Sequence, residues 1–346
     1  MGVPEVFISF ETAAGSAIRR SGRGAVALAL RDGTEGAPAC AVYRALSEAD
    51  RAHFTAEGYR LLTLAFRAAP RSVAVVRVGE KEDEAYTALD RLEFDYLAAP
   101  GLAQEGAASY VRAQRAAGRG IKAVLANAAA PDDEGIVNFC ASGLVLTDGA
   151  VDAADYTARI AGILAATPLT RSATYAPLAE VAACDEQDDP GAAVDAGKLI
   201  VVRTGESYCL GRAVNSLTTL TPTHGAAFQK IKIVDGVDLI RADIARTFRA
   251  GYIGSVLNDY DNKLLLVTAI NAYLASLAGD VLDRSAENVC RVSLSGQRGW
   301  LEAHGTDTSG WTDAAILRAN TGSEVFLEAS LTFCDAMEDL TLRIAM

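Results

Sequence analysis

The chain has 346 residues, half of them hydrophobic, and 44 acidic against 32 basic residues give it a formal net charge of −12. This length allows two or three domains with large cores. The acidic excess argues against nucleic-acid binding by phosphate neutralisation, which needs clusters of basic residues. The longest aliphatic runs, such as residues 264–267, are far too short to span a bilayer. We therefore expect neither a nucleic-acid nor a membrane partner.

The start of the chain lacks a secretion signal, because Glu5 and Glu11 stand where a basic region and an apolar run would be needed. This predicts a soluble protein made in the cytosol. The six cysteines are scattered, with no CxxC pair and no histidine at ligand spacing. This pattern predicts buried free thiols in a reducing compartment, without a structural metal.

A short apolar strand is predicted near the N-terminus, directly after Pro4. Apolar residues there recur every second position, which is the period of a β-strand. The residues of this N-terminal arm are Val6, Phe7, Ile8, Ser9 and Phe10. No neighbouring segment offers it an obvious partner strand.

The next part of the chain predicts an α/β layer. Apolar runs that read as strands alternate with helical patterns, which indicates crossover units on a parallel sheet. The predicted strands are residues 25–30, 72–78, 92–97, 121–125 and 143–146, and the predicted helices are residues 47–69, 107–117 and 152–166. The acidic run Asp185–Gly191 then reads as a loop between domains.

A second, mixed domain is predicted after that loop. Its expected elements are a hairpin of residues 199–203 and 211–220, strands at 230–234, 289–294 and 325–333, and helices at 237–248, 262–277 and 312–320. The fold class is therefore α/β in the first region and α+β over the whole chain.

The C-terminus repeats the pattern of the N-terminus. Four apolar residues alternate with more polar ones up to the last position: Leu340, Thr341, Leu342, Arg343, Ile344 and Met346. An apolar strand at a free end is buried either in the sheet of its own domain or on the edge of a neighbouring subunit. Because both ends show the pattern, we favour exchange of strands between subunits.

Catalytic and ligand-binding motifs are weak. The run Gly22–Ala27 fits the letters of a dinucleotide fingerprint, G-x-G-x-x-A, but its context is wrong, because a strand-like run stands where a helix should begin. The three histidines are dispersed and no G-x-S-x-G elbow is present. The acidic groups at residues 132–134 and 185–189 lack the spacing of a calcium loop. We expect no catalytic residue, no metal and no cofactor.

Several segments of the second half are similar to contractile tail sheath proteins, especially the shorter ones of Gram-positive myophages, defective prophages and phage-tail-like bacteriocins. The segments that carry this resemblance are Gly211–Leu220, Lys230–Val234, Val256–Lys263, Ala319–Ser323 and Asp335–Leu340, together with Pro4–Phe10 and the Arg23-Gly24 turn. In that family the α/β region is often described as subtilisin-like in topology. Since no catalytic triad is visible, that description implies no activity here.

The resemblance implies an assembly role and a domain plan. The expected parts are an N-terminal arm (1–21), a small strand and helix region (22–84), an outer α/β sheath domain (85–190), a tube-proximal sheath domain (191–322) and a C-terminal arm (323–346). It also implies stacked hexameric rings that form a helical sheath, exchange of terminal strands between subunits, and contraction that drives an inner tube through a cell envelope.

The partners implied are the inner tail tube protein and the baseplate and terminator proteins, in a phage tail or phage-tail-like particle. We select the short helix as a possible tube contact through Thr312, Ile316 and Asn320. The competing interpretations are an α/β enzyme, a hydrolase or nucleotide-binding protein, that oligomerises through its terminal strands, and a structural protein of another kind, such as a tube or capsid component.

Overall fold

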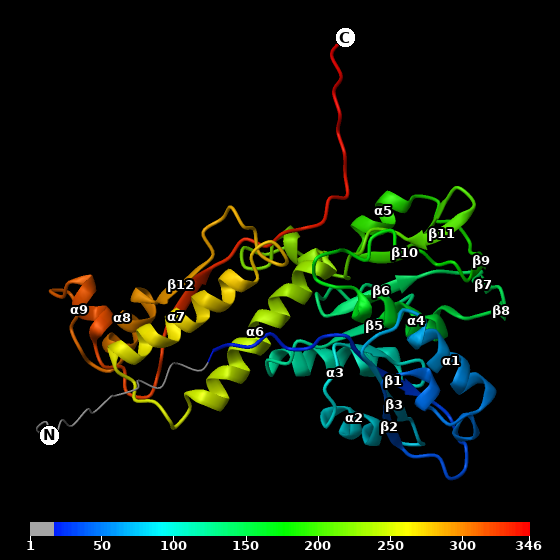
Figure 1. Cartoon of the computed structure of the whole chain (residues 1–346), viewed down its shortest axis with the longest axis horizontal. Coiled ribbons are helices and arrows are strands. Elements are labelled where there is room, and N and C mark those ends of the chain that lie inside the picture. Colours follow the sequence, from blue (N-terminus) through cyan, green and yellow to red (C-terminus); the bar gives the residue numbers. More distant parts are fainter. Residues whose placement is uncertain (1–16) are drawn as a thin grey trace, which may run out of the picture. The chain divides into compact units, whose positions relative to one another are not determined.

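The apolar runs between residues 25 and 210 assemble into one eight-stranded sheet in the computed structural model, which describes residues 17–346. The strand order is β11-β10-β6-β5-β4-β1-β3-β2 (Figure 1). The inner strands pair in parallel, while β2 and β11 run antiparallel at the two edges. The strands are β1 (Ala25–Leu30), β2 (Cys40–Tyr43), β3 (Ser72–Arg77), β4 (Tyr96–Ala98), β5 (Lys122–Ala126), β6 (Ile136–Cys140), β10 (Lys198–Thr204) and β11 (Ser207–Leu210).

Helices cover both faces of this sheet. They are α1 (Ala56–Phe66), α2 (Glu82–Asp90), α3 (Gln104–Ala116), α4 (Ala153–Ala166) and α5 (Pro190–Asp195). A small sheet of β7 (Val145–Leu146), β8 (Gly149–Ala150) and β9 (Val181–Ala183) and the 3-10 turns Leu46–Glu48, Arg51–His53 and Ala226–Gln229 complete this part.

Strand β1 shows why the strands are apolar along their whole length. Its larger residues, Val26, Leu28 and Leu30, pack in the core under α1 and α4. Its alanines at 25, 27 and 29 pack in the core with α2 and α3. A parallel sheet buried on both faces needs apolar residues at every position. Helices α1 and α4 approach closely at Gly162, where an added Cβ would strike the carbonyl oxygen of Ala65.

The described chain divides into two compact units. The sheet unit consists of Ser21–Ala242 and Asp335–Met346, and the helical unit consists of residues 17–20 and Asp243–Cys334. The helical unit holds α7 (Tyr260–Ser276), α8 (Leu294–Ala303), α9 (Asp313–Arg318) and a two-stranded sheet of β12 (Val289–Val292) and β13 (Leu327–Ser330). The division falls inside α6 (Ile231–Gly251).

The mixed α/β class is confirmed, but the compact units do not follow the expected domain boundaries. The main sheet continues across 84/85 and 190/191, because β1 pairs with β4 and β10 pairs with β6. The run Asp185–Gly191 is therefore a connection within the sheet unit rather than a loop between units. The N-terminal strand predicted at residues 6–10 lies outside the described residues.

Two local predictions were wrong. Residues 230–234 were expected to form a strand, but Ile231 begins the long helix α6. The second strand of the hairpin is residues 207–210 rather than 211–220. Of the six cysteines predicted to be buried, Cys140, Cys209 and Cys290 are buried, Cys184 and Cys334 are half-buried, and Cys40 on the edge strand β2 is exposed.

Buried charges tie the start of α6 to the sheet. Lys122 of β5 is only 2% exposed, and its Nζ lies 3.0 Å from Asp235 and 2.8 Å from Asp238. Arg23 approaches Asp235 to 2.7 Å, and Arg115 of α3 approaches Asp238 to 2.8 Å. Burial disfavours the charged form of Asp238, but the two cations outweigh it and lower the pKa of that carboxyl. Charge pairing with distant residues therefore fixes where this helix docks.

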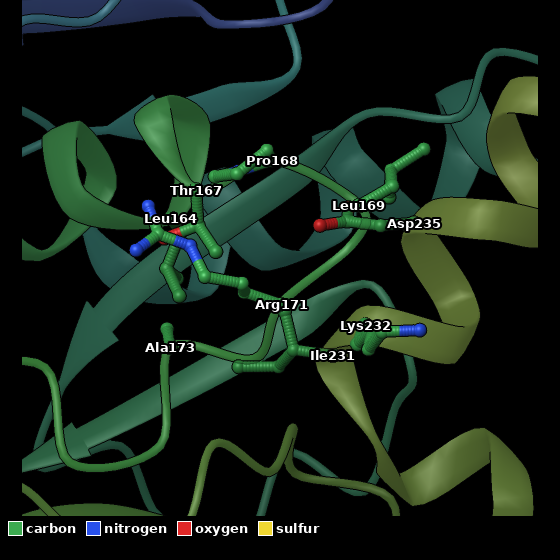
Figure 2. Close-up of a pocket in the computed structure, with 9 residues that line it drawn as sticks. All are labelled: Leu164, Thr167, Pro168, Leu169, Arg171, Ala173, Ile231, Lys232 and Asp235. Atoms are coloured by element: carbon green, nitrogen blue, oxygen red, sulfur yellow. The ribbon is translucent and has the colours of Figure 1, made fainter. Parts of the chain in front are cut away.

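A small hollow adjoins this cluster. Figure 2 shows residues that line it, among them Ile231, Lys232 and Asp235 of α6 and Leu169 and Arg171 of the segment that follows α4. Its volume of about 10 Å³ is close to the room that one water molecule needs. The first turns of α6 are thus packed almost without gaps against the sheet unit.

The replacement Lys122→Met should destabilise the sheet unit by about 3 kcal/mol, the lower end for a broken buried ion pair, because Arg23 and Arg115 still pair with the two carboxylates. The measurement is urea unfolding followed by circular dichroism, since both tryptophans, Trp300 and Trp311, lie in the helical unit. The exposed Lys81 provides the matched control. A Lys122→Met midpoint equal to that of Lys81→Met would contradict the structural role of this cluster.

Candidate functional site

The last residues of the chain project as an extended segment with no helix or strand assignment (Figure 1). Their large apolar side chains are open to solvent: Leu340 is 89% exposed, Leu342 71% and Ile344 77%. Met346 is fully exposed as well. Residues 340–346, the last part of the predicted arm and from here on called the C-terminal arm, therefore combine an apolar face with backbone groups that have no partner strand in the described chain.

A cluster of ion pairs marks the place where this arm begins. Glu338 lies with its side chain 6% exposed in the sheet unit, in contact with Lys230 and 3.6 Å from Arg212. Thr174 donates to its Oε1 at 2.6 Å, and Ser172 donates to the same oxygen at 3.3 Å. One carboxylate thus joins three separate segments of the sheet unit.

Two further carboxylates flank Glu338 and use the same cations. Asp339 lies 2.6 Å from Arg212, and Asp335 lies 3.4 Å from Lys230. We call these five residues, Asp335, Glu338, Asp339, Arg212 and Lys230, the clasp. The clasp fixes residues 335–339 on the sheet unit and leaves the C-terminal arm free.

The clasp perturbs the acidity of its members. Burial by itself opposes ionisation of Glu338, but hydrogen bonds from Lys230 and Thr174 and the charges of Lys230 and Arg212 prevail and lower its pKa. The hydrogen bond from Arg212 lowers the pKa of Asp339. Both carboxylates are therefore held in their charged form.

The two-stranded sheet of the helical unit offers one free edge. The side-chain amide of Asn271 donates to the carbonyl of Cys290 at 3.0 Å and accepts from its backbone N–H at 2.7 Å. Asn271 therefore takes up both backbone hydrogen-bonding groups of Cys290, which point away from β13. In an antiparallel pair the residue opposite Cys290, which is Ala329, also directs its backbone groups outward. No described residue takes up the outer backbone groups of Ala329, so the available edge is that of β13.

Two of the three residues proposed as a tube contact at α9 are exposed, and one is buried. Thr312 caps it by accepting from the N–H of Ala315, and Thr312 is exposed. Asn320 is also exposed and accepts from the N–H of Gly322. Ile316 is completely buried within the helical unit, so it stabilises the helix and does not form a contact surface.

The acidic loop at residues 132–134 is engaged in contacts of its own. The Thr219 side chain and the backbone N–H groups of Thr219 and Thr218 lower the pKa of Asp132 by hydrogen bonding. Asp133 pairs with Arg112, and Glu134 with Arg115. Within residues 17–346, no three His, Cys, Asp or Glu side chains gather as metal ligands would, and no helix is long and apolar enough to cross a membrane.

Sequence reasoning singled out residues 340–346, which were expected to form a strand and are extended without a partner strand in the described chain, but it missed the clasp. The acidic residues of the run 335–339 were visible, yet their cations lie at positions 212 and 230, more than a hundred residues away. Nothing in the local pattern links those positions. The spacing of three carboxylates just before an apolar strand was the only available signal.

The clasp should be sensitive to acid. The pKa of Glu338 in the folded subunit lies below the ordinary value of 4.5. Glu338 therefore contributes stability that is fully present above pH 4.5 and is lost as the pH falls through the lowered pKa. We expect Glu338→Gln to lower the free energy of unfolding by about 1.5 kcal/mol at pH 7. This is the lower end of the range for hydrogen bonds to charged groups, because the clasp is near the surface. Urea unfolding at pH 7 and pH 3 tests this. A cost that persists at pH 3 would contradict the ionic origin.

No family model matches the chain. Over 364 aligned residues, the chain is 35% identical to the tail sheath protein of Clostridium phage phiCD119, and the alignment covers 100% of this chain and 99% of that protein.

Solved structures share the fold. The sheath tail protein of Desulfitobacterium hafniense superposes with a TM-score of 0.71 at 18% identity, covering 84% of this chain and 94% of that one. The helical sheath of the anti-feeding prophage in its contracted state gives a TM-score of 0.72 at 14% identity, covering 100% of this chain and 99% of that one. The identity to the phage protein extends over the whole length, and the chain therefore belongs to the tail sheath proteins, which are structural proteins rather than enzymes.

Proposed function

We propose that this chain is the repeating subunit of a contractile tail sheath and that its terminal strands link each copy to its neighbours. The observation that carries this proposal is the C-terminal arm, an extended apolar segment exposed to solvent with no partner strand in the described part of its own chain. Such a segment is a source of aggregation unless a second chain covers it. Strand addition covers it and satisfies its backbone.

The edge of β13 is the proposed acceptor. Asn271 already occupies part of the opposite edge of this small sheet, at β12. Ala329 directs an N–H and a carbonyl outward, and β13 is largely exposed. An incoming strand from another copy would extend the sheet there. The N-terminal arm, residues 6–10, is the second proposed donor.

A donor strand on one copy and an acceptor edge elsewhere on the next make a heterologous contact. Repetition of such a contact generates rings when the rotation closes and helical filaments when it does not. We propose stacked hexameric rings around an inner tube, with baseplate and terminator proteins at the ends. Residues 85–190 would face outward, and residues 191–322 would lie nearer the tube, with Thr312 and Asn320 among the contacts.

Contraction then needs two packings of the same subunit. The extended sheath would be a kinetically trapped lattice, and a signal at one end would release it to the tighter packing. The arms would keep the subunits joined during this change. The free energy stored at assembly would drive the tube through the target envelope.

The double replacement Leu342→Asp with Ile344→Asp should abolish tube formation without unfolding the subunit. Both side chains are exposed in the unassembled chain, so their loss costs little there. Their burial against a neighbour would be blocked by the desolvation of two charges. Sedimentation and negative-stain electron microscopy provide the measurement.

The matched control places the charge on the other side of the strand. Thr341→Asp lies on the opposite face of the alternating pattern, and tubes should still form. If the double variant assembled as well as Thr341→Asp, the arm would not be the link.

The acceptor edge is tested with proline. Ala329→Pro removes an outward N–H that β12 does not use, so the helical unit should stay folded while assembly fails. Ser330→Pro removes an N–H that pairs with Val289 and should instead destabilise the helical unit itself.

Tryptophan fluorescence separates these outcomes, since both tryptophans belong to the helical unit. Normal tubes from a folded Ala329→Pro protein would exclude β13 as the acceptor edge.

A further inference from the structure

The clasp lies at the point where the chain passes from the helical unit to its free end. The helical unit ends at Cys334, and Asp335 is the first residue of the segment held on the sheet unit. The arm becomes free directly after Asp339. Whatever the clasp does to residues 335–339 therefore changes the length of chain available to another copy.

The clasp holds its segment by polar contacts and not by apolar burial. Between Asp335 and Asp339, Met337 is completely exposed and only the Glu338 side chain is deeply buried. The flanking pairs, Arg212 with Asp339 and Lys230 with Asp335, are in contact with solvent, and such pairs have a modest net strength and can be replaced by water. The apolar arm differs, because its removal from a partner would expose a continuous hydrophobic face.

We propose that the clasp is a releasable length control for the C-terminal arm. When it is closed, only residues 340–346 extend from the subunit. When it opens, residues 335–339 are released as well and add up to about 17 Å of extended chain. The inference rests on the proposed sheath function, in which two subunit packings place the donor and the acceptor at different separations.

The shared cations make this release cooperative. Arg212 contacts both Glu338 and Asp339, and Lys230 contacts both Glu338 and Asp335. Loss of the central carboxylate therefore loosens the flanking pairs too. Thr174 adds a further tie, because its hydroxyl accepts from the N–H of Ala213 while it donates to Glu338. A pull on the arm would open the group as one unit.

The first test uses the unassembled subunit. A nitroxide on Met337→Cys, in a background with the exposed Cys40→Ser, reports motion of the clasped segment by electron paramagnetic resonance. We expect Glu338→Gln to make this label several-fold more mobile, and Glu206→Gln, a replacement of an exposed glutamate in the β10–β11 turn, to leave it unchanged. Equal mobility in Glu338→Gln and the parent would overturn the clasp as the restraint.

The second test locks the clasp in the assembled sheath. Arg212→Cys with Asp339→Cys, in the Cys40→Ser background, places two solvent-accessible thiols at the Arg212–Asp339 pair and keeps Glu338 on Lys230. A short bis-maleimide crosslinker then ties the segment covalently to the sheet unit. With the crosslink formed, particles should show one axial subunit spacing by electron microscopy before and after mild denaturant, and without the crosslinker they should show two. Failure of the crosslink to form in the free subunit would contradict the closed clasp, and two spacings in the locked particles would contradict the length control.

These outcomes are separable from the proposed function. If the parent protein formed no tubes, the sheath proposal would fail, and with it the length control, while the mobility result would still show whether the clasp holds the arm. If the parent contracted normally and the locked protein did too, only the length control would fail.

Discussion

An extended apolar segment that pairs with no sheet in the described chain is the constraint on which the rest of this structure depends. The exposed faces of Leu340, Leu342 and Ile344 cannot remain in water in a stable assembly, and their backbone groups need a partner. The fold of the described chain provides no such partner for them. In the proposed sheath, the free edge of β13 in a neighbouring copy would provide that partner.

The sheet unit and the attachment of the C-terminal arm are stabilised by different interactions. Within the sheet unit, a large apolar core on each side of the eight-stranded sheet provides stability that does not depend on other copies. The free strand is joined to that unit by ion pairs, whose strength depends on pH and on salt. A rigid body with a polar, replaceable attachment suits a lattice whose subunits must move while they stay connected.

Charge pairing also decides the course of α6. The run that begins at Lys230 alternates like a strand, with isoleucines at 231 and 233, and a short apolar run of this kind fits either structure. The carboxylates of Asp235 and Asp238 resolve the choice, since only a helix brings both of them to Lys122. That cation is more than a hundred residues distant in sequence, so no local window could have included it.

The sequence by itself determined the alternation of strands and helices on a parallel sheet, the arm at residues 340–346 and its family resemblance, because these depend on period and composition within short segments. The tertiary structure alone decided the division inside α6 and the burial of Ile316. It also decided that Asn271 binds the outer backbone groups of β12 at Cys290, and that Glu338 attaches to Lys230. Each of these rests on a contact between residues far apart in the chain, and such contacts leave no periodic trace in the sequence.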